Sequence, residues 1–581
     1  MISVDNALSC CADRRLGGPF TLGRQLLRTL LDSDGPWRHP KENLVLSFVD
    51  PNPSIPDEAA PLALRTPSVN RIQHFPQRHL WYLCHAVAEV VEHHLPEETL
   101  IEVCHLAEAD ETDRLLVQAL VERARFRLRP PPVRVVRGNH VEPGTEAPLD
   151  EAALLDAVRL GYYETAELCG RVLVDEADWP EDYDADFHAL LHAHTVTLIA
   201  VGRPIESVWY SRIAARRWGG PALRASAHHG QAMFHSHFGG PADLDLDRAA
   251  RSWGKAMTAA ASIAEPELRA RRTAFYENSL ALAHRKNGDL ATALSRIDAG
   301  LAVLDRGGQE ALQHWMVLRG NRAAVLTLLG RADEALADLD HAVACDPANA
   351  QPLVDRATAF RAVGRTEEAL RDLTHAIDHC VCGPEAYVNR ASLLLAAGEL
   401  DAALEDLRLA RLLDDSCDAT LVQFAEVLID AELFAEAADL LHEWTGHDPS
   451  ATVWALRARL AVAGGAAGHA LATVDAGLVR HPASDVLRTE RAAVLHLLRR
   501  PAEALAELDH VCAGGEGDPV VEANRVLLLV ECGRQHEALA RARRLLRREV
   551  SDEIRSYVRD VLAGVGHPVP TAEAADLGPV L

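Results

Sequence analysis

Lysine is almost absent from this sequence: among 581 residues it occurs only at Lys41, Lys255 and Lys286. A phosphate-binding P-loop needs a lysine that reaches the phosphates from a glycine-rich turn, with Ser or Thr directly after it. Gly254-Lys255 is the only Gly-Lys pair, and Ala256 follows it. An ordinary P-loop ATPase is therefore excluded.

Other motifs of common enzyme classes are also missing. The sequence has no GxSxG elbow and no GxGxxG turn after a strand, which removes the usual serine-hydrolase and dinucleotide sites. HExxH is absent, and no cysteine pair near a histidine cluster has zinc-finger spacing. We therefore expect a non-enzymatic protein without a cofactor. An enzymatic activity stays open only for the N-terminal part.

Long apolar runs are lacking as well. No stretch reaches the ~18 apolar residues needed to cross a bilayer, and residues 1–31 show no charged-then-apolar leader. The eleven cysteines are odd in number and scattered, which suits reduced thiols in the cytoplasm. The net charge of −26 makes nucleic acid and anionic membranes poor partners. Abundant Arg, Ala, Gly, Pro and Leu suggests a GC-rich bacterial source.

Aromatic residues make up only 5% of the chain, so a core must consist mostly of Ala, Leu and Val. These residues follow a repeat. A turn marker recurs at spacings of 34, 34, 34, 33, 34 and 34 residues, at Gly330, Gly364, Gly398, Glu432, Gly465, Arg499 and Gly533. Eight residues before each marker an arginine recurs, with Phe424 as the one exception, and an alanine follows five residues after each marker.

This pattern resembles the tetratricopeptide repeat, a 34-residue pair of antiparallel helices. The resemblance covers about residues 275–550. Because one helix pair cannot bury its apolar face alone, such pairs stack into a superhelix with a concave surface. The implied fold class is mainly α: a right-handed α-solenoid of helix pairs with a small N-terminal α/β domain.

The predicted organisation has four parts. Residues 1–145 form the small α/β domain, 146–274 divergent helix pairs, 275–565 the solenoid, and 566–581 a flexible tail. In the first part we predict strands over 43–50, 100–106 and 133–136 and helices over 79–94 and 112–126, with a proline-rich loop at 51–61. Alternating helices and strands favour a parallel sheet.

The second half of the N-terminal domain weakly resembles the NTPase module of repeat-bearing signal-transduction ATPases. In that family two acidic residues end a strand, followed by a leucine and an Ala-Asp pair. Here Cys104 and His105 hold the acidic positions, before Leu106 and Ala109-Asp110. Neither replacement binds magnesium as a carboxylate does. The resemblance therefore implies a degenerate, non-hydrolysing module, and an unrelated α/β cap is the alternative.

Three local clusters could carry chemistry. His188, His192 and His194 lie close together on a predicted helix and are metal-ligand candidates, but satisfied or solvated histidines are the favoured interpretation. Cys380-x-Cys382 lies in a linker between repeats without a strong cationic neighbour, which favours inert thiols. The run 175–186 (DEADWPEDYDAD) lacks the glycine turn and terminal Glu of a calcium loop, so it is interpreted as a solvated acidic loop.

The repeat surface is the remaining candidate site. In the tetratricopeptide family, ligands lie in the concave groove lined by the first helix of each pair, here six and three residues before each marker. The corresponding groove residues are Thr327, Thr358, Arg361, Ser392, Leu395, Glu426, Arg459 and His496. The family's Lys/Asn carboxylate clamp is not reproduced, and Arg361 and Arg459 stand as isolated cations. The mixed, fairly apolar lining favours an extended or helical peptide, although part of it can equally be packing within each repeat.

The leading hypothesis is a scaffold or adaptor that binds a protein or peptide partner. A regulator with a non-hydrolysing NTPase-like N-terminal module is the first alternative, and a metal-dependent enzyme using the His188 cluster is the second. The sequence leaves the oligomeric state open.

Overall fold

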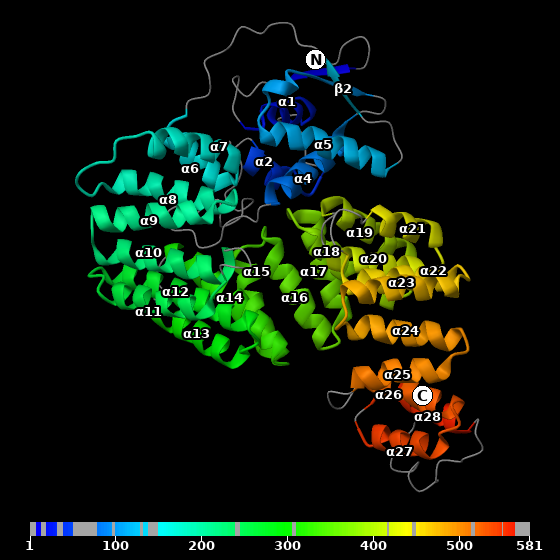
Figure 1. The fold of residues 1–581 in the computed structure, drawn as a ribbon. Helices are drawn as coiled ribbons and strands as arrows, with labels where there is room; N and C mark the ends of the chain where they lie inside the picture. Colours follow the sequence, from blue (N-terminus) through cyan, green and yellow to red (C-terminus); the bar gives the residue numbers. More distant parts are fainter. Residues whose placement is uncertain are drawn as a thin grey trace. The chain divides into compact units, whose positions relative to one another are not determined.

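The computed structural model describes residues 7–12, 19–31, 39–49, 78–95, 99–127, 132–136, 149–238, 244–304, 309–414, 418–443, 449–512, 518–548 and 550–563. The predicted proline-rich loop at 51–61 and the tail at 566–581 lie outside these ranges. The chain forms two compact units, Met1–Asp414 and Asp415–Leu581. The ribbon is shown in Figure 1.

The first unit begins with a small parallel sheet. Its order is β1-β2-β3, and the strands are Ala7–Cys11, Leu100–Cys104 and Val133–Val136. Four helices accompany it: α1 (Thr21–Leu30), α2 (Glu42–Val49), α4 (His79–His94) and α5 (Glu111–Phe126). The parallel sheet, β2, β3, α4 and α5 confirm the sequence prediction. β1 was not predicted.

The strand predicted at 43–50 is wrong, because this segment forms helix α2. Its buried apolar residues, Leu44, Val45, Phe48 and Val49, repeat with the period of a helical face. The carboxylate of Glu42 accepts a hydrogen bond from the backbone N–H of His39 at 2.7 Å, which is half of a capping box. A short apolar run does not by itself distinguish a strand from a buried helix.

Further helices follow between residues 149 and 286. The core of the first of them is continuous with that of the sheet, because one hydrophobic cluster runs from Leu8 to Ala214. The helices are α6 (Glu151–Leu160), α7 (Tyr163–Gly170), α8 (Ala185–Ala200), α9 (Pro204–Arg217), α10 (Pro221–Met233), α11 (Leu246–Ala261) and α12 (Pro266–Lys286). Two π-helical segments, η5 (Arg171–Asp175) and η6 (Phe234–Phe238), extend α7 and α10.

The regular repeats follow, and their helix pairs confirm the predicted α-solenoid of tetratricopeptide type. In the first unit they are α13 (Leu290–Val303), α14 (Gln309–Leu328), α15 (Ala332–Cys345), α16 (Ala350–Ala362), α17 (Thr366–His379), α18 (Pro384–Ala396) and α19 (Leu400–Leu413). In the second unit they are α20 (Asp418–Asp430), α21 (Phe434–Glu443), α22 (Ala451–Ala463), α23 (Ala467–Arg480), α24 (Asp485–Leu497), α25 (Pro501–Val511), α26 (Pro519–Glu531), α27 (Gln535–Leu546) and α28 (Asp552–Ala563).

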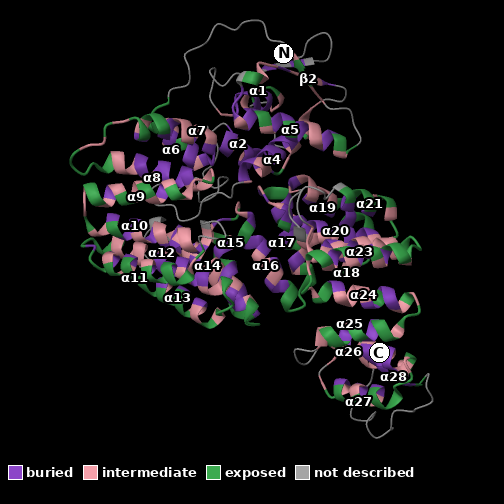
Figure 2. Ribbon diagram, viewed as in Figure 1, coloured by how far each residue is buried: buried purple, intermediate pink, exposed green. Residues whose placement is uncertain are grey.

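The repeated residues have clear structural roles. Every turn marker has a positive φ, including the non-glycine markers Glu432 (59°) and Arg499 (60°), so each ends its first helix in a left-handed turn. The alanines five residues after the markers, such as Ala369 and Ala403, are fully buried, which lets the helices approach closely. In Figure 2 the helices of the repeats carry buried positions, in purple, alternating with intermediate and exposed ones.

In most repeats the recurring arginine forms ion pairs between helices, whereas Arg457 donates to the backbone carbonyl of Leu441. Arg390 on α18 binds both carboxylate oxygens of Asp406 on α19, at 2.7 and 2.8 Å. Arg356 binds Asp372 in the same way and also reaches Asp340 of the preceding pair. The arginine register therefore marks structure rather than ligand binding. Among the described residues, no helix is both long and apolar enough to cross a membrane.

Candidate functional site

The predicted groove residues of the first unit lie on consecutive first helices of the repeats. We call Thr327, Thr358, Arg361, Ser392 and Leu395 the helix-A row; they belong to α14, α16 and α18. α14 contacts α16, and α16 contacts α18, so the row runs across neighbouring helices. Arg361 is exposed and the other four residues are half-buried. The row is thus part of the surface rather than of the core.

The chemistry of the helix-A row is weakly polar. Each hydroxyl donates a hydrogen bond to the carbonyl one turn back in its own helix: Thr327 to Ala323 at 2.9 Å, Thr358 to Val354 at 3.1 Å and Ser392 to Val388 at 3.0 Å. These hydroxyl protons are therefore committed to the helix. Arg361 makes no ion pair with any residue that the structure describes. The row offers small side chains, Leu395 and one cation.

The corresponding residues of the second unit carry their own ion pairs. Arg459 on α22 contacts Glu490 at 3.1 Å and Glu426 at 3.7 Å, and His496 contacts Glu531 at 2.9 Å. The prediction that Arg459 is an isolated cation is therefore wrong. Its partner Glu490 lies on the next first helix, and a single sequence does not reveal which carboxylate will meet it.

The three candidate metal-ligand histidines point to different neighbours. His194 is buried and its Nε2 lies 2.9 Å from Asp175, whereas His188 lies against Tyr183. Burial, with a further contribution from Arg272, lowers the pKa of His188 to about 4. Within the described ranges no group of three or more His, Cys, Asp or Glu side chains could hold a metal ion. His192 shares a face with His188 but does not complete a site.

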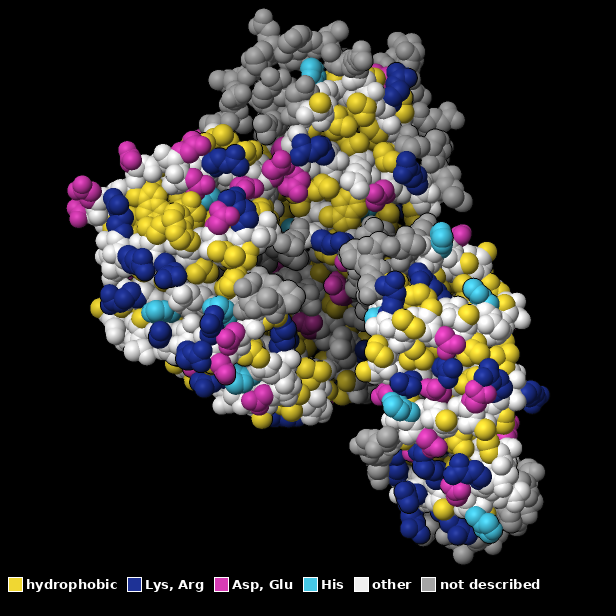
Figure 3. Space-filling model, in the orientation of Figure 1, with side chains coloured by type: hydrophobic (Ala, Val, Ile, Leu, Met, Phe, Trp, Pro, Cys, Tyr) yellow, Lys and Arg dark blue, Asp and Glu magenta, His cyan; other side chains and the backbone are white. Residues whose placement is uncertain are grey.

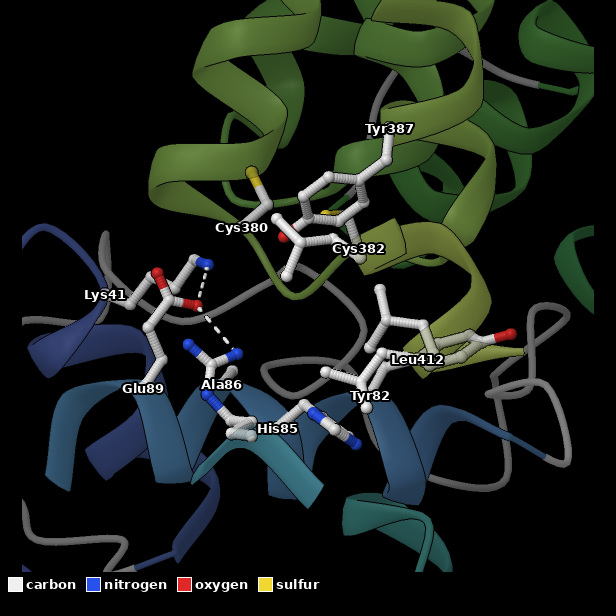
Figure 4. A pocket seen from close by; sticks show the side chains of 12 residues that line it. Lys41, Tyr82, His85, Ala86, Glu89, Cys380, Cys382, Tyr387 and Leu412 are labelled. Atoms are coloured by element: carbon white, nitrogen blue, oxygen red, sulfur yellow. Dashed lines mark hydrogen bonds and ion pairs between the residues drawn. The ribbon is translucent and has the colours of Figure 1, made fainter. Parts of the chain in front are cut away.

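A cleft that the sequence did not reveal lies within the first unit, where the N-terminal domain meets the linker before α18 (Figure 4). Its empty volume, including the open solvent at its mouth, is about 340 Å³. The N-terminal domain contributes Lys41, Tyr82, His85, Glu89 and Arg123, and the repeats contribute Cys380, Cys382, Tyr387, Leu409, Leu412 and Leu413. Arg78 and Asp414 form an ion pair across the same junction.

The charges in this cleft satisfy one another. The ammonium group of Lys41, only 2% exposed, lies 2.8 Å from Glu89. Burial works to raise the pKa of Glu89, but Lys41, His39 and Arg123 together hold it well below its usual range. Burial and Arg123 lower the pKa of His85 to about 3, so its ring is neutral. The Lys41–Glu89 ion pair therefore lies on the N-terminal side of the cleft, facing the linker before α18.

The two cysteines of the linker are poor nucleophiles. Burial raises the pKa of Cys382 to about 11 and that of Cys380 to about 12, so both thiols stay protonated near neutral pH. This agrees with the prediction that the CxC linker is inert. A Cβ added at Gly383 would lie 3.1 Å from the Tyr82 ring, so this glycine permits α4 to approach the linker closely.

The resemblance to an NTPase module is not supported. The thiol of Cys104 donates to the carbonyl of Cys10, and the N-terminus of α1 is already occupied. The carboxylate of Asp113 accepts hydrogen bonds from the backbone N–H groups of Leu22 at 2.9 Å and Gly23 at 3.2 Å. A helix N-terminus that follows a strand is where phosphate commonly binds. Here the chain's own carboxylate takes that place.

Asp113 predicts a specific pH dependence. Burial and the neighbouring Asp110 raise its pKa to about 7. Because the folded-state pKa exceeds the unfolded value, stability is greatest below the unfolded pKa and is lost as pH rises through 7. Opening of α1 should therefore cost about 2 kcal/mol more at pH 5 than at pH 8, measured as hydrogen-exchange protection of Leu22 and Gly23.

The control for this prediction is Asp113→Asn, which keeps an acceptor oxygen but cannot titrate. Its protection should change much less between pH 5 and pH 8 than that of the wild type. Equal pH dependence in both proteins would show that Asp113 is not the responsible group. Comparing the two proteins cancels the opposite contributions of buried histidines such as His85.

Comparison with known proteins adds little. No protein-family model and no curated protein matches the sequence. Among solved structures, the chain is similar to yeast Tom70 (TM-score 0.40, 14% identity, 74% of this chain and 98% of that one). It is also similar to a tetratricopeptide repeat protein from Parabacteroides merdae (0.38, 18%, 44% and 99%) and to PilF of Pseudomonas aeruginosa (0.31, 17%, 39% and 99%).

Proposed function

We propose that this protein is a non-enzymatic scaffold that binds a segment of a partner protein along the helix-A row. The observation that carries the proposal is the contrast between the two units. In the first unit the row is on the surface and Arg361 has no ion pair with the described residues. In the second unit Arg459 and His496, at equivalent positions, lie in salt-bridge contact with Glu490 and Glu531. Of the two units, the first therefore presents a groove cation that no described residue pairs.

The chemistry of the row suggests what kind of segment it binds. Leu395 and the small residues Thr327 and Thr358 suit an extended or helical segment with apolar side chains. Arg361 suits a carboxylate on that segment, because guanidinium groups bind carboxylates with two parallel hydrogen bonds. Binding would come from several modest contacts, with Arg361 setting the register.

We also place this scaffold in the cytoplasm. No disulfide joins the cysteines that the structure describes. The thiols for which a pKa shift is resolved, such as Cys84 and Cys169, have raised pKa values because they are buried. Buried, protonated thiols suit a reducing compartment.

Charge reversal at Arg361 tests the proposal. Arg361→Glu should reduce recovery of the specific partner from source-cell lysate about tenfold or more, because attraction for a carboxylate becomes repulsion. The matched control is Arg371→Glu, which makes the same change on α17, the second helix of the same repeat, at another exposed position. Equal recovery with wild type and both variants would contradict binding along the helix-A row.

A further inference from the structure

An exposed aromatic surface lies elsewhere in the first unit, on the loop before α8 and on α8 and α9. Although the chain has only nine tryptophans, three of them, Trp179, Trp209 and Trp218, lie within 40 residues. Tyr183 and Trp209 are 55% and 56% exposed, and the neighbouring Ile205 is 64% exposed. Figure 3 shows the hydrophobic patch over α8 and α9, with acidic side chains beside it. Exposed apolar patches of this kind mark interaction sites.

The part of this surface beside the acidic loop is a stacked cluster. We call Trp179, Tyr183, Phe187 and Trp218 the aromatic face. Trp179 and Trp218 stack with ring centroids 5.7 Å apart and an interplanar angle of 19°. Tyr183 and Phe187 each meet Trp218 edge-on at 6.0 Å. The rings therefore support one another while part of their surface faces solvent.

Hydrogen bonds hold the aromatic face in place. The indole N–H of Trp179 donates to the carbonyl of Val174 at 3.0 Å, and that of Trp218 donates to the carbonyl of Pro180 at 3.1 Å. Arg217 donates to the carbonyls of Trp179 and Pro180 at 2.7 and 2.9 Å. A surface fixed in this way loses little conformational entropy on binding. Since the indole N–H groups are committed and Trp179 stacks on both Trp218 and Tyr210, the ring most open to solvent is that of Tyr183.

The charge around the aromatic face is unbalanced. Residues 175–186 contain seven carboxylates and no cationic side chain. Glu176, Asp178, Glu181, Asp182 and Asp186 are exposed, and none of them forms an ion pair with a described residue. By contrast, the repeat carboxylates Asp372 and Asp406 are paired with arginines. The exposed cations on α9 are Arg212, Arg216 and Arg217, and Arg217 contacts the loop. The five exposed carboxylates still leave an excess of negative charge on the loop side.

We propose that the aromatic face binds an arginine-containing basic segment of a partner protein. A guanidinium group stacks on the faces of Trp and Tyr rings and at the same time pairs with carboxylates, so it satisfies both features of this surface. A neutral apolar segment would leave the loop carboxylates without counter-charge. This surface is separate from the helix-A row, so a failure of one proposal would not contradict the other.

Binding of defined peptides to the full chain tests this inference. The probe is a short fluorescent peptide of alternating arginine and serine, compared with its lysine and glutamate counterparts by anisotropy. Asp178→Asn/Glu181→Gln/Asp182→Asn should weaken binding of the arginine peptide about tenfold, because three unpaired charges are lost. Tyr183→Ala should weaken it severalfold, and the lysine peptide should bind more weakly than the arginine peptide.

The matched control is Glu367→Gln/Asp401→Asn/Glu405→Gln, which removes three exposed carboxylates from α17 and α19. This control should leave binding nearly unchanged. Equal weakening by the loop variant and the control would overturn the proposal, because attraction would then come from the net charge of −26 alone. Indifference to Tyr183→Ala would overturn it too. Self-association through the aromatic face without peptide binding would also overturn the proposal, since the face would then bind a second copy of this chain.

Discussion

Arg390→Met is expected to lower the opening free energy of α18 and α19 by about 3–5 kcal/mol, because it leaves a buried carboxylate without its partner. Asp406 is only 2% exposed, and Arg390 holds both of its oxygens. Burial already raises the pKa of Asp406 despite the arginine. Without Arg390 the carboxyl group must take up a proton or stay charged in the interior. Native-state hydrogen exchange of α18 and α19 measures the loss.

Two further variants make this prediction specific. The double variant Arg390→Met/Asp406→Leu should recover much of the stability, since a buried ion pair replaced by apolar residues is often nearly neutral. Arg365→Met removes an exposed pair with Glu368 within α17 and should cost less than about 1 kcal/mol. A similar loss of opening free energy in Arg390→Met and Arg365→Met would show that the recurring arginine does not stabilise the helix pair through its ion pair.

Glu89→Ala is expected to cost about 3–5 kcal/mol at the junction of the N-terminal domain, because it leaves the buried Lys41 ammonium uncompensated. The effect should appear as increased hydrogen exchange in α4 and in residues 380–387, which face each other across the cleft. The low pKa of Glu89 gives the pH dependence. Its contribution is present above the unfolded pKa of about 4.3 and is lost as pH falls below that value.

The surface pair between Arg159 and Asp156 provides the control for the junction. Asp156 is exposed, and Asp156→Ala should change stability by less than about 1 kcal/mol. Lys41→Met/Glu89→Leu should be better tolerated than Glu89→Ala. If Glu89→Ala left exchange in α4 at the wild-type rate, the Lys41–Glu89 pair would not stabilise the N-terminal side of the cleft.

The repeats were predictable because their signals are local and repeated. Each turn marker fixes the end of a helix, and buried alanines such as Ala369 recur at a fixed distance from it. The same helix-pair pattern therefore occurs several times in one sequence, and each copy supports the assignment of the others. The N-terminal domain has no such redundancy. Its segment 43–50 is a single short apolar run, and β1 (Ala7–Cys11) consists of small residues with weak strand preference.

The site was less predictable because its properties depend on contacts between distant residues. The helix-A row follows from the repeat register, but the partners of Arg459 lie on the neighbouring first helices. Lys41 and Glu89, which form an ion pair, are 48 positions apart in the sequence. They line the same cleft as Cys382. The rarity of lysine was the one signal that could have singled out Lys41. The acidic loop was visible in the sequence, but its stacked aromatic partners on α9 were not.

Site-specific photo-crosslinking in the source cells tests the central claim most directly. A photoreactive residue would replace Thr358 or Leu395 on the helix-A row, or Arg371 or Leu400 on the second helices as matched controls. The scaffold account predicts that positions 358 and 395 form adducts with the same partner and that positions 371 and 400 do not. Identical adducts from all four positions, or none from positions 358 and 395, would contradict it.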